Sequence, residues 1–292
     1  MLGPGRMIGI LLVDKPKGIT SHDVVSRVRR VFKTKRVGHA GTLDPLADGL
    51  LVVAVGPATR FLNYLALEPK EYTAVVRFGQ ETATYDAEGE CVCSRPVPKD
   101  LDKSLSDILP GLLGEINQMP PLFSAIKKDG RPLYDYARRG EAVEVQPRQV
   151  TIQSISIAKA AGENDRKMTV ICGGGTYIRS LAHDLGQAVG CGGHIIELRR
   201  TGAGRFSVDQ AVDLEQISPN DLIPLSEALS PMPLLKVSLG EEADIRQGRR
   251  IKASPGDDLV ALCQATGEVF ALARRIGDEL QPECVIPTGP QD

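Results

Sequence analysis

The order of strand-like and helix-like segments constrains the fold of this chain more than any other feature. Short apolar runs at residues 8–13 and 50–55 predict buried strands, and residues 71–78 alternate like a half-buried strand. Valines at helical spacing after the capping residue Thr20 predict a helix over residues 21–33. Further strands are predicted at residues 150–157, 167–172, 195–200 and 206–208, and further helices at residues 58–67, 102–114 and 177–189. Because strands and helices mix without regular βαβ alternation, the sequence favours an α+β fold over a doubly wound sheet.

Two stretches of the chain contain several prolines: one indicates a domain boundary and the other an exposed excursion. Pro231 and Pro233 indicate a boundary, after which predicted strands at residues 234–237, 259–263 and 269–274 suggest a small β-rich unit. We therefore expect domains at residues 1–230 and 231–292. Residues 119–140 contain several breakers and read as a long exposed excursion with a short helix around Tyr134–Arg138.

Composition excludes several classes of protein. With 292 residues, 42% of them hydrophobic, the chain can bury a large core. It has no apolar stretch of the roughly 18 residues that a membrane span needs, and its start lacks a signal-peptide layout. None of its six cysteines has C-x-x-C spacing, and its four histidines lack metal-like spacing. We expect a cytoplasmic protein with free thiols and no metal or cofactor.

Charge is clustered although the formal net charge is only −2. Residues 27–36, RVRRVFKTKR, hold six basic residues and no acid. Two further basic groups are Lys127, Lys128, Arg131, Arg138 and Arg139, and Arg246, Arg249, Arg250 and Lys252. Each could be an ordinary solvated surface, but three such groups together suggest an anionic partner.

Familiar catalytic motifs are absent. GGGTY at residues 173–177 lacks the frame of a P-loop, and neither G-x-G-x-x-G nor G-x-S-x-G occurs. GTLD at residues 41–44 is similar to the aspartyl phosphatases, but His39 and Ala40 occupy the positions where those enzymes place two aspartates. We reject that interpretation.

One carboxylate has an unusual setting, in HAGTLDPLADG at residues 39–49. Pro45 pushes Asp44 toward an extended backbone, while Gly41 and Gly49 permit dihedrals that other residues resist. Taken alone, this is a turn in which Asp44 caps the backbone or is solvated.

Six sequence blocks, in order, resemble the bacterial TruB-type tRNA pseudouridine-55 synthases. The blocks are DKPKGITSHDVV (14–25), GHAGTLDPLADGLL (38–51), KEYTAVVRFGQETATYDAEGE (70–90), PPLFSAIKKDGRPLYDYARRG (120–140), GGTYIRSLAHDLG (174–186) and LRRTGAGRF (198–206). The resemblance implies a pseudouridine synthase fold with a mixed, largely antiparallel sheet and flanking helices. It also implies a C-terminal PUA-like RNA-binding domain, and conversion of a T-loop uridine to pseudouridine without a cofactor.

The resemblance also assigns roles to residues. Asp44 would be the catalytic carboxylate, acting as a nucleophile or as a base for a sugar proton. Tyr72 would stack on the base, and Arg179 would pair with Asp44 and keep it ionised. His39 would hold the loop open around a flipped base, and Tyr177 and Leu198 would line the pocket. Residues 117–150 correspond to an RNA-gripping insertion. The predicted phosphate contacts are Lys15, Arg27, Arg30, Lys33, Arg36, Lys127, Lys128, Arg138 and Arg139.

Each assignment has a structural alternative. Tyr72, Tyr177 and Leu198 could be core residues, Arg179 a surface helix residue, and His39 a turn residue. A synthase acting on another RNA, or a non-catalytic tRNA-folding protein, is the alternative function. We expect tRNA as the partner, a monomer without an obligatory protein partner, and no membrane association.

Overall fold

The computed structural model describes residues 7–253, 256 and 258–288. The chain forms two compact units. The first comprises residues up to 44, residues 50–66 and residues from 210 onward, and the second comprises residues 45–49 and 67–209. Strand β3 (Ala47–Val55) therefore begins in the second unit and continues into the first.

The first unit builds its N-terminal part around β1, α1 and β3. Thr20 caps α1 by accepting from Asp23 N–H at 3.1 Å, while Thr20 N–H donates to the Asp23 carboxylate at 2.8 Å. Strand β1 pairs in parallel with β14, and β2 pairs antiparallel with β3. The elements are β1 (Gly9–Lys15), α1 (Ser21–Val31), β2 (Val37–Ala40), η1 (Gly56–Tyr64), β14 (Val212–Asp213), η4 (Pro219–Asp221) and α5 (Leu225–Ala228).

Valines on one side of α1 give this part its core. Val24, Val25 and Val28 are buried against Leu11, Val13 and the buried side chains of β3. Leu214 and Ile217, from far along the chain, complete the cluster. The helix predicted from the valine spacing is confirmed.

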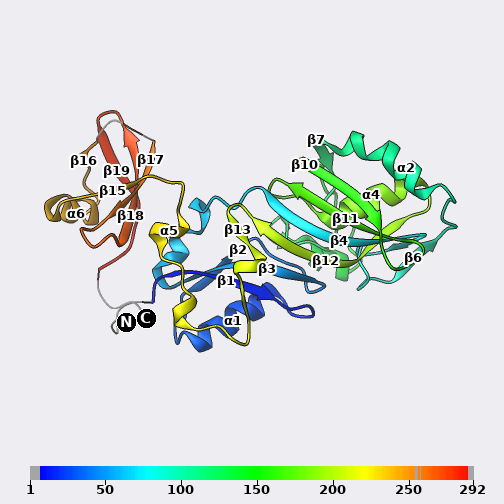
Figure 1. The fold of residues 1–292 in the computed structure, drawn as a ribbon, viewed down its shortest axis with the longest axis horizontal. Coiled ribbons are helices and arrows are strands. Elements are labelled where there is room, and N and C mark those ends of the chain that lie inside the picture. Colours follow the sequence, from blue (N-terminus) through cyan, green and yellow to red (C-terminus); the bar gives the residue numbers. More distant parts are fainter. Residues whose placement is uncertain (1–6, 254–255, 257, 289–292) are drawn as a thin grey trace. The chain divides into compact units, whose positions relative to one another are not determined.

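The C-terminal residues form a separate five-stranded sheet, drawn in orange and red in Figure 1, with strand order β15-β17-β18-β19-β16. Its own core includes Leu262, Phe270 and Leu280. The elements are β15 (Leu234–Lys236), α6 (Leu239–Arg246), β16 (Ile251–Lys252), β17 (Leu259–Cys263), β18 (Val269–Ile276) and β19 (Glu279–Val285). The three strands predicted here are present, and the sheet begins three residues after Pro231.

The second unit is built on long, twisted strands that run side by side in Figure 1, in the order β12-β4-β11-β10-β7. All of these pairs are antiparallel, and β12 also pairs in parallel with the start of β3. Helix α4 packs on β12 and β4, and α2 packs on α4. The elements are β4 (Lys70–Phe78), β5 (Gln80–Thr82), β6 (Cys91–Ser94), α2 (Leu101–Ile108), η2 (Leu109–Leu112), β7 (Gly114–Gln118), β8 (Lys127–Lys128), β9 (Arg131–Pro132), α3 (Leu133–Arg138), β10 (Arg148–Lys159), β11 (Asp165–Cys172), α4 (Ile178–Val189), β12 (Gly193–Ala203), β13 (Phe206–Ser207) and η3 (Val208–Gln210).

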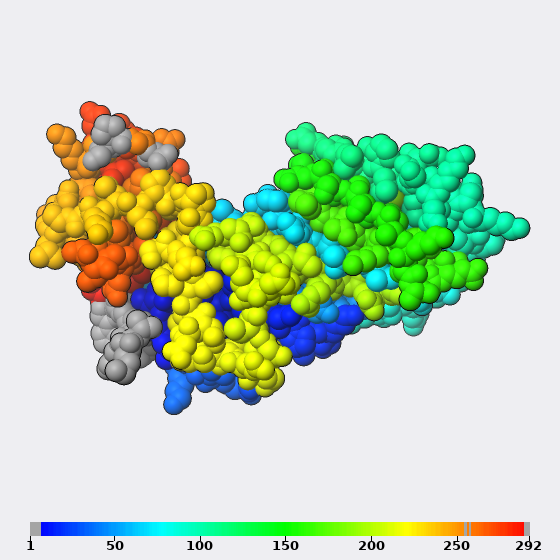
Figure 2. Space-filling view, in the orientation of Figure 1, coloured from blue at the N-terminus to red at the C-terminus, as the bar shows by residue number. Residues whose placement is uncertain are grey.

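The α+β class, with a mixed and largely antiparallel sheet, is confirmed. The excursion at residues 119–140 is more ordered than expected, because it holds the β8–β9 hairpin as well as the predicted short helix. Leu133 is buried there, and its N–H donates to Ile126 O at 2.7 Å. Part of this segment therefore packs on its own unit. Figure 2 shows one face of the molecule, with the second unit mainly in cyan, green and yellow-green.

Candidate active site

Asp44 is half-buried in the turn between β2 and β3 of the first unit. The side chain of Ser21, the first residue of α1, holds Leu43, the residue before Asp44. Leu43 N–H donates to Ser21 Oγ at 2.9 Å, and Ser21 Oγ donates to Leu43 O at 3.1 Å. Because Leu43 and Ser21 are both buried, the backbone leading to Asp44 is held by the start of a helix.

Glycine is required at the other end of this turn. Gly49 has a φ of 100°, and a Cβ there would overlap the carbonyl oxygen of Arg200 on the neighbouring strand. The close approach lets Ala47–Gly49 pair with Leu198–Arg200. Gly49 thus has a steric reason.

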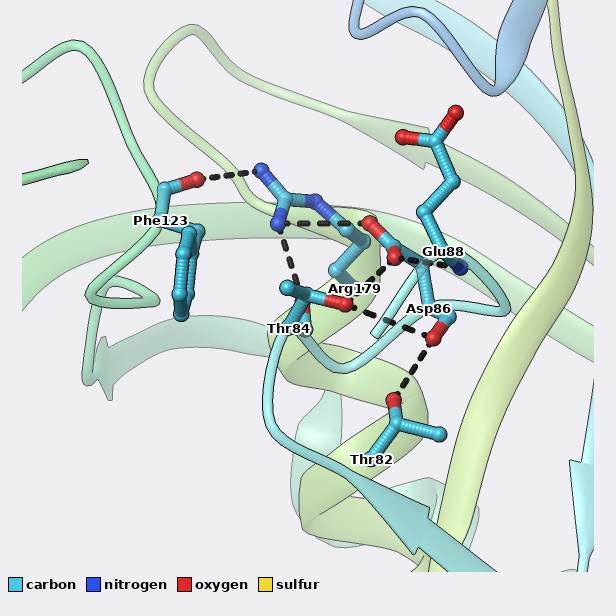
Figure 3. Close-up of polar contacts among 6 residues, drawn as sticks. All are labelled: Thr82, Thr84, Asp86, Glu88, Phe123 and Arg179. Carbon is cyan, nitrogen blue, oxygen red and sulfur yellow. Dashed lines mark hydrogen bonds and ion pairs between the residues drawn. The ribbon is translucent and has the colours of Figure 1, made fainter. Parts of the chain in front are cut away.

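Arg179 lies in the first turn of α4 and is almost completely buried. One guanidinium nitrogen donates to Thr84 O at 2.9 Å and lies 3.4 Å from the Asp86 carboxylate. The other donates to Phe123 O at 2.9 Å. Figure 3 shows this arginine between the two loops. Arg179 is therefore a positioned, buried cation and not a surface helix residue.

Asp86, which the sequence analysis missed, is buried beside Arg179. Its carboxylate accepts from Thr84 Oγ1 at 2.5 Å and from Glu88 N–H at 3.1 Å, and its carbonyl accepts from Thr82 Oγ1 at 2.6 Å (Figure 3). Threonines two and four residues earlier, in TATYDAEG, were the available signal, because a threonine hydroxyl can form a turn by bonding to the backbone two residues on.

The predicted pocket residues lie on the strands and helix start of the second unit. Tyr72 on β4 is 8% exposed and stands in register with Val170 and Arg200 on its two neighbours. Leu198 on β12 is 6% exposed. Tyr177 precedes α4, where its N–H donates to Gln118 Oε1 at 2.8 Å and its carbonyl accepts from Gln118 Nε2 at 3.0 Å.

The predicted site residues, which include His39, are divided between the two units, and Lys70 lies near Tyr72 in the sequence. Burial, followed by repulsion from Arg200, lowers the pKa of Lys70, two residues before Tyr72. His39 is half-buried on β2, opposite Val53. Asp44 and His39 thus belong to the first unit, and Tyr72, Tyr177, Arg179 and Leu198 to the second. The pairing of Arg179 with Asp44 stays a proposal.

One predicted phosphate contact differs from the expectation. Lys15 is fully buried, and its ammonium donates to Pro16 O at 3.0 Å and Ile19 O at 2.7 Å. In this position it stabilises the loop before α1 and is closed to a phosphate. The pattern of basic residues could not reveal this, because an ammonium satisfied by carbonyls can be buried.

The other basic residues of residues 27–36 vary in availability. Arg27 is paired with Glu215 at 2.6 Å, whereas Arg30 and Lys33 are exposed and Arg36 is half-buried. In the insertion, Lys127, Arg138 and Arg139 are exposed and Lys128 is half-buried. Arg139 lies 3.9 Å from Glu141, and Lys128 donates to Glu144 O at 2.8 Å.

The third basic group is largely neutralised. Arg246, Arg249 and Arg250 pair with Glu242, Asp244 and Glu279 at 2.7, 2.9 and 3.1 Å. Their charge is therefore a weaker indication of an anionic partner than the sequence suggested.

Three further features of the described residues are their possible metal ligands, their thiols and the length of their helices. Within the described residues, no three His, Cys, Asp or Glu side chains gather to hold a metal ion. All six cysteines are free thiols, and Cys91 is exposed. Every helix in the described ranges is too short or too polar to span a bilayer.

Two family models match the chain. One, described as "TruB family pseudouridylate synthase (N terminal domain)", covers residues 29–178, and one described as "tRNA pseudouridylate synthase B C-terminal domain" covers residues 179–232.

Curated relatives match nearly the whole chain. A protein named tRNA pseudouridine synthase B from Thermobifida fusca (strain YX) is 44% identical over 286 residues, 95% of this chain and 98% of that one. A protein of the same name from Mycobacterium tuberculosis (strain ATCC 25618 / H37Rv) is 41% identical over 284 residues, 95% of each chain.

Solved structures are similar as well. A chain of a "Cbf5-Nop10-Gar1 Complex" is 27% identical with a TM-score of 0.69, covering 96% of this chain and 85% of that one. A chain of an H/ACA RNP "bound to a substrate RNA containing 2'-deoxyuridine" is 25% identical with the same TM-score, covering 98% and 86%.

Proposed function

This chain belongs to the TruB family of pseudouridine synthases, and from that premise we propose that it converts a uridine in the T-loop of tRNA, at position 55, to pseudouridine. The observation that carries the proposal is the 44% identity to a tRNA pseudouridine synthase B over 95% of the chain. The reaction is an isomerisation, so substrate and product have the same atoms.

The chemistry requires one bond to break and another to form. The glycosidic bond between N1 and C1′ is cleaved, the uracil turns, and C5 bonds to C1′; the proton displaced from C5 leaves, and N1 gains one. Asp44 either attacks the sugar as a nucleophile or removes a sugar proton. The two hydrogen bonds between Ser21 and Leu43 restrict the backbone that leads to Asp44. Such restriction suits a carboxylate that must meet one atom of the substrate.

Tyr72 and Arg179 support this step in the proposed mechanism. Tyr72 would stack on the target base and accept or relay the C5 proton. Arg179 would orient Asp44 and favour its ionised form. Contacts to Thr84 and Asp86 preset the guanidinium, so little rotamer freedom is lost when it acts.

Substrate binding requires the uridine to leave its stack. Unstacking costs a few kcal/mol, which pocket contacts and phosphate contacts must offset. Tyr177, Leu198 and His39 are the proposed pocket residues. The exposed Arg30, Lys33, Lys127, Arg138 and Arg139, with Lys128 and Arg36 beside them, are the proposed phosphate contacts.

The C-terminal sheet is proposed as a PUA-like RNA-binding domain at residues 231–292. We also propose a cytoplasmic monomer that acts without an obligatory protein partner.

A second candidate function is modification of another RNA. The similarity to chains from a Cbf5-Nop10-Gar1 complex and an H/ACA RNP favours it, because those chains act within assemblies. Relatives at 41–44% identity outweigh structures at 25–27%. A non-catalytic tRNA-folding role is disfavoured because Asp44, Tyr72 and Arg179 are all retained.

The test is pseudouridine mapping on an unmodified tRNA transcript, by carbodiimide treatment and primer extension. The wild-type chain should modify one T-loop uridine without added protein. Asp44→Asn should abolish the product yet leave tRNA affinity within about threefold, because phosphate contacts dominate affinity. Asp107→Asn, the same change at an exposed residue of α2, is the matched control. Product from the Asp44 variant at more than a few per cent of the wild-type single-turnover rate would contradict the assignment.

A further inference from the structure

The turn that contacts Arg179 has an uncommon backbone conformation at its centre. Tyr85 has a φ of 63°, in the left-handed region that residues other than glycine rarely adopt. Its neighbours Thr84 and Asp86 supply the carbonyl and the carboxylate that contact Arg179. The conformation of Tyr85 therefore sets the directions of both groups.

An aromatic stack holds this residue. The rings of Tyr85 and His183 lie parallel, with centroids 3.9 Å apart and planes 14° apart. His183 lies on α4 four residues after Arg179, so both side chains project from the same side of the helix. Helix α4 thus contacts one turn twice, through Arg179 and through His183.

Within the part of the chain that the structure describes, one nitrogen of His183 makes no hydrogen bond that could place the ring. Its Nδ1 is buried and, among the described residues, has no hydrogen-bond partner. The stack on Tyr85 is the ring contact of His183, and the acids Glu81 and Asp184 lie near enough to act on it electrostatically. Tyr85 is also tied through its carbonyl, which accepts from Ile195 N–H on β12 at 3.0 Å.

We propose that Tyr85 and His183 are positioning residues for the isomerisation, because their stack holds the Thr84–Asp86 turn in the conformation that orients Arg179. The catalytic consequence rests on the proposed function, whereas the effect on Arg179 does not. Neither ring is required to touch the substrate. Removing the stack should therefore change the rate of the chemical step and leave tRNA binding unchanged.

The first experiment compares His183→Ala with His183→Phe in the full-length chain. At saturating tRNA transcript, His183→Ala should lower the single-turnover rate about tenfold, because small misplacements of reacting groups are costly. Its Kd for tRNA should stay within about twofold, because the phosphate contacts are unchanged. His183→Phe keeps an aromatic ring and should recover most of the rate.

A second comparison separates the ring from the backbone. Tyr85→Ala loses the stack and retains an unfavourable φ, whereas Tyr85→Gly loses the stack and adopts that φ freely. The glycine variant should therefore be faster than the alanine variant. Leu105→Ala, in the buried core of α2, is the control for lost stability, and its rate should stay at the wild-type value at a temperature where it is folded.

A measurement on the protein without tRNA distinguishes failure of the stacking proposal from failure of the proposed function. NMR resonances of the Arg179 guanidinium, assigned with Arg179→Lys, should show faster exchange in His183→Ala than in the wild-type chain. If the wild-type chain makes no pseudouridine, the proposed function fails and this measurement still tests the stack. Wild-type rate and unchanged Arg179 resonances in His183→Ala would overturn the inference, as would a His183→Phe variant as slow as His183→Ala.

Discussion

At the scale of single residues, the pair formed by Arg179 and Asp86 decides how the candidate site is held. Both side chains are 4% exposed, so their charges have little water around them. A buried cation without its carboxylate is strongly unfavourable. Asp86 therefore both closes a turn and compensates the buried charge of Arg179.

Asp86→Asn should destabilise the protein and slow the reaction. Removing one partner of a buried ion pair costs about 3–5 kcal/mol in the free energy of unfolding, and asparagine recovers part of it through its oxygen. Urea unfolding measures the stability, and single-turnover assays measure the rate. Glu90→Gln, at an exposed acid of the same loop, should change neither. An Asp86→Asn variant with wild-type stability would contradict this account of the pair.

The sequence could identify those site residues that lie in a recognisable local motif. Asp44 stands out because proline and glycines surround it, and Arg179 because it lies in GTYIRS. The pairing of Asp86 with Arg179 depends on groups brought together by the fold, and the burial of Lys15 depends on the conformation of the loop that follows it. Lys15 reads as a surface cation until the carbonyls of Pro16 and Ile19 are placed around its ammonium.

At the scale of elements, β4 and β11 are joined by an ion pair as well as by their ladder. Arg77 stands opposite Asp165 and donates to both of its carboxylate oxygens, at 2.8 and 2.9 Å. Hydrogen bonding from Arg77 lowers the pKa of Asp165, against the opposing effect of burial. The pair contributes stability wherever Asp165 is ionised.

Asp165→Asn should lower stability by about 1 kcal/mol near neutral pH, a modest value because Arg77 is half-exposed. Since the folded pKa is depressed, the contribution is present above the ordinary unfolded pKa of about 3.9 and is lost as the pH falls through the folded value. The difference in urea midpoint between variant and wild type should therefore shrink only below about pH 4. Lys167→Ala, at an exposed position of β11, is the control. A difference that shrinks already at higher pH would contradict the assignment.

The insertion at residues 117–150 gives a second prediction for an element. If exposed Arg138 and Arg139 each contact a phosphate, changing both to alanine should flatten the slope of log affinity against log salt by about 1–2 units. The rate at saturating tRNA should change much less. Filter binding at several salt concentrations measures the slope, with Lys167→Ala again as control. An unchanged slope would show that this helix end is not an RNA contact.

Elements with their own apolar pattern were predictable, and elements defined by a partner were not. The helix α1 and the strands β4, β10 and β11 follow from periodicity. Strand β7, with sequence GEINQ, has no such pattern and is a strand because it pairs with Arg148–Ile152 of β10. The β8–β9 hairpin could not be predicted either, because its two strands, KK and RP, also lack an apolar pattern.

At the scale of the whole molecule, the C-terminal sheet should matter for binding more than for chemistry. A chain ending at Ser230 lacks that sheet but keeps every residue proposed for catalysis. We expect its Kd for tRNA to rise by about tenfold or more, and its saturating rate to fall less, if this sheet contacts phosphates. Circular dichroism verifies that the shortened chain is folded. A folded chain with unchanged affinity would count against an RNA-binding role for this domain.

The late position of β14 in the sequence has a consequence for how the protein is made. Val13 on β1 pairs with Val212 on β14, and Leu214 and Ile217 complete the core that α1 begins. At about 5–20 residues per second, a ribosome needs about 10–40 s to synthesise the intervening chain. During that interval most of the core of α1 can collapse from residues 9–55, while one flank stays open to water. The core around α1 thus stays incompletely closed until about three quarters of the chain has been translated, and during that wait a chaperone would find apolar surface to bind.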